Sequence, residues 1–413
     1  MSSPSAPRRG MTSIHPMRPP TLPPASRSRA MLRLTAAASE GRFELQSCRA
    51  CGRYQYPPRE ACVHCISTRL AWTDCDGAGE LISDTVLRHS NELYVRERLP
   101  TRIGLVRLDI GVDVVSYIHP ACASAPARVR LRAHLDKTGQ AAMVAHPPGD
   151  HIDMSPSRLL SEMTSDPRGQ NILVTDGTTA TGQAMVKALV DAGASLVWIG
   201  MTEPSENTGG QDAIASLPNV TVMPLDLTDP RSVDEVSRLI GAEVDILINT
   251  AEVPRATRIG VHGIEAARAE MDVSYIGFLR LIEAFGDALK SRAVEENVRA
   301  TAWVNILSIY AISALPSQAT FSASKAAAFA VSQALRSDMQ QAGVRVVNVF
   351  PGPIDDEWNH LVPPPKLAPS ALATAVVNGL KQGVEDIYPG DVAQDLRTRW
   401  HENAKVLERE LAE

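Results

Sequence analysis

Two Cys-x-x-Cys pairs constrain the fold of this chain more than any other feature of its sequence. Ten residues separate the pairs, and this spacing lets four thiolates converge tetrahedrally on one Zn²⁺. Four thiolates leave zinc no open position, so the predicted metal is structural. The alternatives are two unrelated pairs of buried cysteines or a redox dithiol. The predicted ligands are Cys48, Cys51, Cys62 and Cys65.

The length of 413 residues exceeds the size at which one hydrophobic core usually stops growing, so two domains are expected. The composition, 44% hydrophobic and 21% charged, is that of an ordinary soluble protein, and a net charge of -6 argues against coating nucleic acid. No apolar run approaches the roughly 20 residues of a membrane-spanning helix. Cysteine usage fits a reducing cytoplasm, and Cys75 and Cys122 are expected to be buried small apolar residues.

The N-terminal segment 1–29 is predicted to be a disordered tail. The first 35 residues contain six arginines, no acidic residue and many prolines and serines, so they bury too little apolar surface to become ordered. An organelle transit peptide and a start codon assigned too far upstream are the alternatives, although the prolines between Pro19 and Pro24 interrupt any long amphipathic helix.

Residues 30–147 are expected to form a β-rich domain. A short helix is predicted over Ala30–Ser39, and Ile110-Gly111 is typical of a hairpin turn. Short β-branched segments separated by turn residues favour a small barrel. The predicted strands are Leu81–Leu87, Ile103–Asp109, Asp113–Ile118 and Ala127–Leu135.

A proline-containing linker, 148–169, with one short helix near Leu159, separates this domain from residues 170–413. Beyond it strands and helices alternate, which predicts an α/β doubly wound Rossmann domain with a parallel sheet covered by helices on both faces. The strands are expected near Ile172, Leu196, Val220, Ile246, Val304 and Val346, and the helices include Gln183–Ala192, Ala266–Leu289 and Ser322–Gln340.

Several motifs accompany the cysteines: Cys48-Arg49-Ala50-Cys51-Gly52, Pro57-Pro58-Arg59, Cys62-Val63-His64-Cys65, Gly77-Ala78-Gly79-Glu80, Leu99-Pro100 and Gly104-Leu105-Val106-Arg107-Leu108-Asp109. With them, residues 30–147 resemble the proteins in which a rubredoxin-like zinc ribbon precedes an OB-fold. The resemblance implies a partner that docks on a thiolase-like acyl-CoA enzyme and helps to shape the site for its CoA thioester.

Binding of single-stranded nucleic acid by such a barrel requires a basic groove with stacking aromatic side chains. Arg128, Arg130 and Arg132 alternate along one strand and would share a face, but aromatic residues make up only 4% of the chain. A solvated strand face is the simplest interpretation of these arginines, and contact with a CoA phosphate or an acidic partner is the next. We therefore expect no nucleic-acid partner.

A second set of motifs lies in the C-terminal half: the turn Asp176 to Gly182, Leu225-Asp226-Leu227-Thr228-Asp229, Asp245-Ile246-Leu247-Ile248-Asn249-Thr250-Ala251, Ser308, Phe321-Ser322-Ala323-Ser324-Lys325 and Pro351-Gly352-Pro353-Ile354. With these motifs, the chain from about Asn171 to Gly390 resembles the short-chain dehydrogenase/reductase (SDR) family. The resemblance implies a site for NAD(P) that includes Gly182, Asp226, Asn249 and Ile354.

The glycine turn departs from the family pattern. Asp176 and Ala180 stand where the family has glycine, so a carboxylate and a methyl group lie near the expected phosphates. Gly200-Met201 offers neither an acid for a ribose 2′-hydroxyl nor an arginine for a 2′-phosphate, and Asp356 adds an acid near the nicotinamide end. We therefore predict impaired NAD(P) binding.

The catalytic positions implied by the resemblance are also altered. Ser308 and Lys325 are retained, whereas Phe321 replaces the proton-transferring tyrosine and Ser274 replaces the asparagine of the proton relay. General acid–base assistance is worth roughly 10²–10⁴-fold in rate, so the loss of the phenol predicts an inactive site. Tyr310, two residues after Ser308, is an alternative acid.

Together the two halves predict an accessory subunit of a β-oxidation-like assembly. The ribbon and barrel would engage a thiolase-like enzyme, and the SDR-like half would pair with itself or with an active dehydrogenase through the helices Ala266–Leu289 and Ser322–Gln340. The alternative is an active NAD(P)-dependent 3-hydroxyacyl-CoA dehydrogenase that uses Ser308, Lys325 and an atypical acid.

Overall fold

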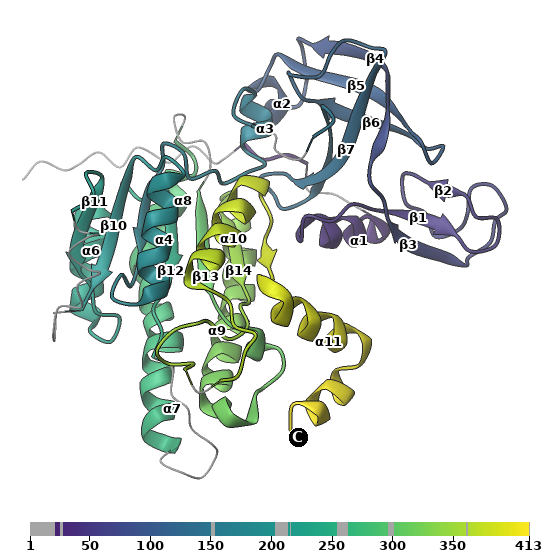
Figure 1. Ribbon diagram of the computed structural model, residues 1–413. Coiled ribbons are helices and arrows are strands. Elements are labelled where there is room, and N and C mark those ends of the chain that lie inside the picture. Colours follow the sequence, from purple (N-terminus) through teal and green to yellow (C-terminus); the bar gives the residue numbers. More distant parts are fainter. Residues whose placement is uncertain are drawn as a thin grey trace, which may run out of the picture.

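The computed structural model describes residues 21–24, 28–149, 153–202, 214, 216–253, 263–295, 301–360 and 362–412. Most of the predicted tail, 1–29, lies outside these residues. The described chain forms a three-stranded ribbon, a closed barrel and a seven-stranded sheet flanked by helices (Figure 1). None of the helices described is long and apolar enough to cross a membrane.

The ribbon is an antiparallel sheet in the order β2-β1-β3, preceded by the predicted short helix. Its apolar side continues into the barrel core, because Leu34, Phe43 and Leu45 belong to the same buried cluster as the barrel residues Leu81 and Leu131. The elements are α1 (Arg29–Ala38), β1 (Glu44–Cys48), β2 (Tyr54–Gln55) and β3 (Leu70–Asp74).

The barrel closes in the order β4-β5-β6-β8-β7, with β7 pairing back to β4. All four predicted strands are present, but the prediction missed β8. Its sequence, Ala-Ala-Met-Val-Ala-His, has one β-branched residue and lacks alternation because it is almost wholly buried. The strands are β4 (Ala78–Leu87), β5 (Thr101–Leu108), β6 (Asp113–Ile118), β7 (Ala127–Leu135) and β8 (Ala141–His146).

Two short helices, α2 (Leu93–Arg96) and α3 (Arg158–Ser161), pack beside the barrel. The linker prediction placed a short helix near Leu159, and α3 is that helix. Leu159, Leu160 and Met163 are buried with Tyr94 and Val144 of the barrel domain, so this part of the linker contributes to a small core of its own.

The C-terminal half is a doubly wound sheet in the order β11-β10-β9-β12-β13-β14-β15, and every pair is parallel. One apolar cluster, which includes Phe278 and Trp303, and a second, which includes Met185 and Leu372, fill its two faces. The predicted class is confirmed. The strands are β9 (Asn171–Val174), β10 (Leu196–Met201), β11 (Val220–Pro224), β12 (Ile246–Asn249), β13 (Ala302–Ile306), β14 (Arg345–Val349) and β15 (Asp386–Ile387).

The helices of this half follow the predicted alternation with one difference. The segment expected as a single helix, Ala266–Leu289, consists of two α-helices joined by a π-helical turn. The helices are α4 (Ala180–Asp191), α6 (Pro230–Ile240), α7 (Gly263–Met271), the π turn η1 (Asp272–Gly277), α8 (Phe278–Arg292), α9 (Ala319–Gln340), α10 (Pro369–Gln382) and α11 (Gly390–Glu410).

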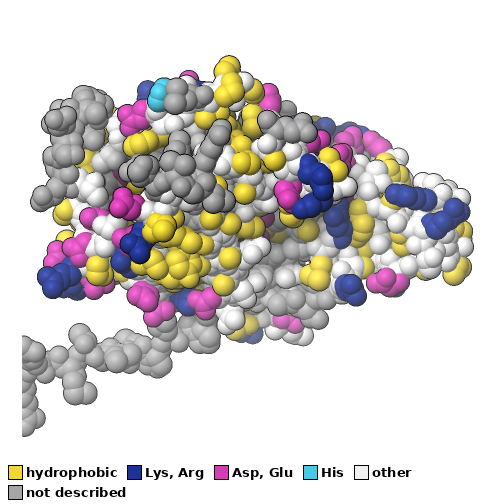
Figure 2. Space-filling model, turned by 90° about the horizontal axis from the view of Figure 1, so that it is seen from below, with side chains coloured by type: hydrophobic (Ala, Val, Ile, Leu, Met, Phe, Trp, Pro, Cys, Tyr) yellow, Lys and Arg dark blue, Asp and Glu magenta, His cyan; other side chains and the backbone are white. Residues whose placement is uncertain are grey.

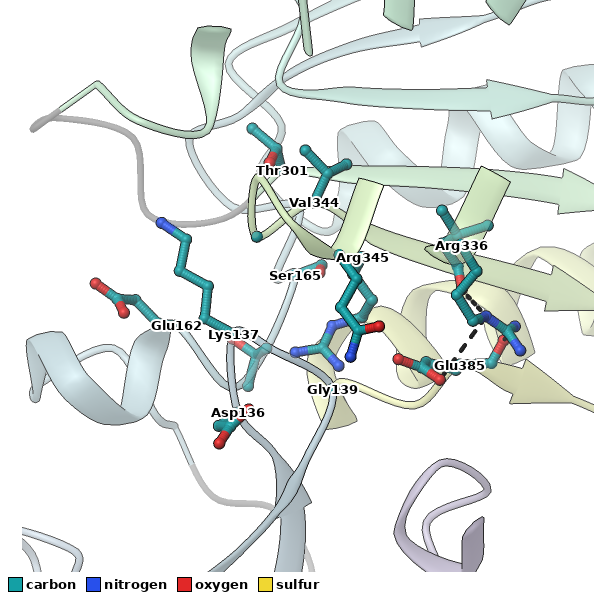
Figure 3. A pocket seen from close by; sticks show the side chains of 14 residues that line it. Asp136, Lys137, Gly139, Glu162, Ser165, Thr301, Arg336, Val344, Arg345 and Glu385 are labelled. Atoms are coloured by element: carbon teal, nitrogen blue, oxygen red, sulfur yellow. Dashed lines mark hydrogen bonds and ion pairs between the residues drawn. The ribbon is translucent and has the colours of Figure 1, made fainter. Parts of the chain in front are cut away.

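The two halves meet through polar contacts around a small pocket of about 20 Å³. In Figure 3, Lys137 from the loop after β7 lies on one side of this pocket and Arg345 and Glu385 on the other. Lys137 Nζ donates to the carbonyl of Ala293 at 2.9 Å, and Arg345 Nη2 donates to the carbonyl of Leu135 at 3.3 Å. The space suits a buried water and little more.

Candidate functional site

Four thiol groups converge in the ribbon. The Sγ atoms of Cys48 and Cys65 lie 3.6 Å apart, and those of Cys51 and Cys62 lie 3.7 Å apart. All four sulfur atoms lie within 4.8 Å of one another. A zinc ion bound to four sulfurs at about 2.3 Å requires sulfur–sulfur distances of about 3.8 Å, so the arrangement fits the metal. All four cysteines are free of disulfides.

The backbone of both knuckles favours the thiolate form of the first cysteine in each pair, Cys48 and Cys62. The N–H groups of Ala50 and His64 donate to the Sγ atoms of Cys48 and Cys62, each at 3.4 Å. A hydrogen bond from the Cys51 backbone is the main cause that lowers the pKa of the Cys48 thiol to about 6, and the His64 backbone lowers the pKa of Cys62. Lowered thiol pKa values are typical of metal knuckles.

Two backbone N–H groups between β9 and the first turn of α4 are bonded to side chains of the loop. The Asp176 carboxylate accepts from the Thr178 N–H at 2.8 Å and from the Thr178 hydroxyl at 2.6 Å. The Thr179 hydroxyl accepts from the N–H of Gly182 at 3.0 Å. A dinucleotide pyrophosphate would need donors at this helix N-terminus. Gly182 has to be glycine, because an added Cβ would lie 1.9 Å from the carbonyl oxygen of Asp176.

The other predicted cofactor residues lie where parallel strands end at the same edge of the sheet. Asp226 follows β11, and its carboxylate accepts from the N–H of Thr228 at 2.8 Å. Asn249 ends β12, and its side-chain oxygen accepts from the Thr175 hydroxyl at 3.1 Å. Ile354 is buried after β14. The strand-end arrangement that this fold class uses for ligands is therefore present, although several of its polar groups bond to neighbouring residues.

Ser308, Tyr310 and Phe321 line one pocket of about 30 Å³ together with Ile354. Ser308 Oγ accepts from the N–H of Tyr310 at 3.2 Å, and burial raises the pKa of the Tyr310 phenol. The pocket has room for about two water molecules. Gln318 and Asn359, which also line it, hydrogen bond to each other at 3.3 Å, and Asn359 donates in turn to Asp356.

Glu252 is a residue of the candidate site that sequence reasoning missed. It follows β12 by three residues and lines the pocket, and its Oε2 atom lies 3.1 Å from Lys325 Nζ. Both side chains are largely buried, with 12% and 3% exposed. Lys325 also donates to the carbonyl of Ile306 at 3.1 Å and lies 5.4 Å from the centre of the Phe321 ring. No motif indicates this pair, because the two residues are distant in the sequence.

Ser274 lies in the π-helical turn η1. Its hydroxyl is buried and lacks a hydrogen-bond partner within the part of the chain that the structure describes. π-helical turns occur often at functional sites, and this one breaks the helix at the position that the family resemblance assigns to the proton relay.

Comparisons with known proteins agree with this division of the chain. The sequence model of the short chain dehydrogenase family matches residues 170–364, and that of the ChsH2, rubredoxin-like zinc ribbon domain matches residues 35–71. An uncharacterized oxidoreductase of Staphylococcus haemolyticus is 26% identical over 220 residues, which cover 52% of this chain and 92% of that protein.

Two solved structures resemble the C-terminal half. A short chain dehydrogenase from Burkholderia cenocepacia J2315, solved in complex with NADP, is 34% identical, with a TM-score of 0.53 over 60% of this chain and 98% of its own. A short-chain dehydrogenase from Streptomyces avermitilis, 21% identical with a TM-score of 0.51 over 59% of this chain and 96% of its own, shares the fold. The chain therefore belongs to the short-chain dehydrogenase family through its C-terminal half and carries a rubredoxin-like zinc ribbon of the ChsH2 type before it.

Proposed function

We propose that this protein is an accessory subunit of an acyl-CoA enzyme assembly and that its dehydrogenase-like half has lost oxidoreductase activity. The ion pair between Glu252 and Lys325, beside Phe321, carries the proposal. In the family, as the sequence resemblance implies, this lysine lowers the pKa of a catalytic phenol and holds the cofactor ribose. Here the ammonium faces a carboxylate and a phenyl ring.

The chemical consequence is the loss of both tasks of the lysine. Phe321 has no proton to exchange, and general acid–base catalysis contributes roughly 10²–10⁴-fold to such reactions. A carboxylate 3.1 Å from the ammonium neutralises the charge that would meet the ribose. The adjoining pocket of about 30 Å³ is too small for a nicotinamide ring and a substrate without rearrangement.

The turn Asp176 to Gly182, in which two of the family's glycines are replaced, supports the same proposal. Asp176 occupies the donors of Thr178, so an incoming pyrophosphate would compete with a carboxylate that is already in place. The two anionic groups would also repel each other at short range. Dinucleotide affinity should therefore be weak before any chemistry begins.

The ribbon and barrel are the proposed docking half. The barrel order β4-β5-β6-β8-β7, with β6 and β8 parallel, supports its assignment as an OB-fold. A ribbon of the ChsH2 type followed by such a barrel resembles the proteins that accompany thiolase-like enzymes, and we assign that partner class to this half. A CoA thioester is then the substrate of the assembly, and the zinc holds the docking surface together.

The SDR-like half is proposed to pair with a second copy or with an active dehydrogenase. Exposed apolar side chains on α7 and η1 favour such a contact, since Ile264 is 72% exposed and Met271 and Ile276 are also exposed. α7 and α9 extend toward the face shown in Figure 2, on which hydrophobic side chains gather. Exposed apolar patches of this kind mark interaction sites.

An active NAD(P)-dependent 3-hydroxyacyl-CoA dehydrogenase is the second candidate. Tyr310 favours it, because this phenol lines the same pocket as Ser308. The relative from Burkholderia cenocepacia J2315 was solved with NADP, which supports a dinucleotide in this fold. The two candidates differ in whether the unmodified chain catalyses NAD(P)-dependent oxidation of 3-hydroxyacyl-CoA thioesters.

Variants that restore the family's residues test whether the dehydrogenase-like half has lost oxidoreductase activity. Phe321→Tyr alone should leave the protein inactive toward 3-hydroxyacyl-CoA thioesters, because Glu252 still neutralises Lys325 and the loop still holds Asp176. Combining it with Glu252→Ala, Asp176→Gly and Ala180→Gly should raise NAD(P)-dependent turnover by at least about 100-fold. The matched control is Phe321→Leu in the same background, which should stay inactive. Efficient turnover by the unmodified chain, free of any other dehydrogenase, would instead favour the second candidate.

Copurification tests the docking half with the full-length chain. A thiolase-like enzyme from the native host should copurify with the tagged wild type and with Cys122→Ser, but not with Cys62→Ser, in which the ribbon loses a zinc ligand. Capture that is equal for all three variants, or capture of proteins without a thiolase-like member, contradicts the proposed division of labour.

A further inference from the structure

A groove of about 400 Å³ lies on the outer side of the barrel, separate from the dehydrogenase-like pocket. Its lining residues come from β5, β6 and β8, from α1, α2 and α3, from the ribbon and from the segment 21–24. Val115 and Tyr117, which point outward from β6, form part of the wall. The volume falls within the range of ligand sites, roughly 300–1,000 Å³.

Tyrosine side chains are concentrated at this groove. Aromatic residues make up only 4% of the chain, yet three of its seven tyrosines line the wall: Tyr56, Tyr94 and Tyr117. Tyr56 and Tyr117 are half-buried, so a molecule in the groove can contact their rings, whereas Tyr94 is buried. A tyrosine ring combines a flat apolar face with a polar hydroxyl. The wall therefore suits a ligand that has both apolar and polar groups along its length.

Two prolines of the chain's own N-terminal segment line the groove. They are Pro23 and Pro24, at the end of the sequence Pro19-Pro20-Thr21-Leu22-Pro23-Pro24, and Pro23 is buried. Proline has a fixed φ and no backbone N–H, so a proline-rich segment is extended before it binds and presents apolar rings and carbonyl oxygens. Grooves lined by aromatic side chains recognise segments of this kind.

Thr21 anchors the segment to the barrel domain. Its hydroxyl donates to Glu97 at 2.5 Å and accepts from Arg98 at 3.3 Å. Arg98 lies over the Tyr94 ring, 3.8 Å from its centre, and donates to Glu162 at 2.7 Å. The segment is thus held at one end by side chains that have other partners within the domain.

The resident segment does not fill the groove. Val115 lines the wall and is still 67% exposed, and the volume of about 400 Å³ stays open beside the segment 21–24. Apolar side chains exposed in a groove are typical of an interaction site. The groove therefore has room for a longer peptide than the four residues that border it.

We propose that this groove binds an extended proline-rich segment of a partner protein, and that the chain's own segment 21–24 is a resident occupant that the partner displaces. The rings of Tyr56 and Tyr117 would receive the prolines. A tethered segment acts at an effective concentration on the order of 1 mM, so it weakens a free peptide with a Kd of about 100 µM roughly tenfold. This binding goes beyond the accessory role proposed above and requires neither a thiolase-like enzyme nor a dinucleotide.

Fluorescence anisotropy of the full-length protein tests the proposal with a labelled peptide of sequence Met-Arg-Pro-Pro-Thr-Leu-Pro-Pro-Ala-Ser, which is that of residues 17–26. Thr21→Ala combined with Pro23→Asp should release the resident segment, because it removes the anchoring hydroxyl and places a charge where Pro23 is buried. This double variant should bind the peptide saturably and about tenfold more tightly than the wild type does. The control peptide, with alanine at its four prolines, should bind at least about tenfold more weakly.

Two pairs of substitutions in the double variant locate the binding site. Val115→Lys should abolish binding, whereas Val86→Lys should not, because Val86 is 43% exposed on β4 but lies outside the groove. Tyr56→Leu should weaken binding about three- to tenfold through the loss of the aromatic face. Tyr54 is equally half-buried and lies outside the groove, so Tyr54→Leu should bind normally.

Circular dichroism melting of each variant checks that the fold is retained. If the double variant does not fold, Thr21→Ala alone should still bind the peptide more tightly than the wild type does. The proposal is overturned if the released protein shows no saturable binding up to about 1 mM, if the alanine peptide binds equally well, or if Val115→Lys and Val86→Lys bind alike. Equal affinity of the wild type and the released protein would show that the segment 21–24 does not compete for the groove.

Discussion

Asp176 places a carboxyl group in the loop before α4, where it accepts from Thr178. Burial raises the pKa of this carboxyl above its ordinary value, and the two hydrogen bonds from Thr178 only partly oppose the shift. A raised pKa in the folded state means that folding favours the protonated acid. This contribution to stability is fully present below the unfolded pKa, near 3.8, and is lost as the pH rises through the folded pKa.

The substitution Asp176→Asn should therefore stabilise the protein at pH 7, because asparagine keeps an oxygen for Thr178 without a buried charge. The gain in melting temperature should shrink as the pH falls toward 4. Asp226→Asn, which alters the same kind of turn in an exposed loop, serves as the control. Melting curves at pH 4 to 8 measure the effect. A gain in melting temperature that grows toward acid pH would show that folding lowers the pKa of Asp176 instead of raising it.

Local motifs predict which residues form the candidate site, but they do not predict the contacts between those residues. The positions of Ser308, Lys325 and Phe321 follow from local motifs, and the structure brings Ser308 and Phe321 to one pocket. The ion pair of Lys325 with Glu252 could not be predicted, because it depends on how β12 and α9 are placed against each other. Such a contact is a property of the tertiary fold rather than of any periodic pattern.

Among the elements, the ribbon is the one that we expect to depend most on a metal. Its strands are short, since β2 has two residues and β1 and β3 have five each. Small modules of this size usually need a metal or disulfides to remain folded. Cys75 is half-buried and Cys122 buried, and both lie outside the thiol cluster.

One zinc ion per chain should copurify with the protein. Cys62→Ser should reduce zinc affinity by more than about 100-fold, because removing a direct ligand costs more than removing a supporting residue. Cys122→Ser, a buried cysteine outside the cluster, should keep the full metal content. Elemental analysis after desalting against a chelator checks this, and zinc-free wild type or zinc-replete Cys62→Ser would each rule the site out.

The elements themselves were predictable where a pattern was strong. The Asp113–Ile118 and Ala127–Leu135 strands were predicted with the bounds that the structure has, because they alternate or contain β-branched residues. β8 was missed because its alanines carry no β signal, and β15 because it has two residues. The π turn η1 was missed because nothing in Asp272–Gly277 departs from helical periodicity.

For the whole molecule, the docking of the two halves was beyond the reach of sequence patterns. The backbone N–H of Glu385 donates to the carbonyl of Ser39 at 2.7 Å, and Lys137 and Arg345 reach across the pocket of Figure 3. Burial lowers the pKa of Arg345 and raises the pKa of Glu385. The attraction between the two charges opposes both shifts. These contacts join the ends of strands and helices and the loops beside them, and no motif in the sequence marks these residues as partners.

We infer that two contacts within the protein weaken dinucleotide binding: Glu252 pairs with Lys325, and the Asp176 carboxylate accepts from Thr178 in the loop before α4. Fluorescence titration of the unmodified full-length protein with NADPH and NADH measures this directly. We expect no saturable binding up to about 1 mM, and recovery of binding in the combined Glu252→Ala, Asp176→Gly and Ala180→Gly variant. Saturable binding by the wild type with a Kd below about 100 µM would contradict it.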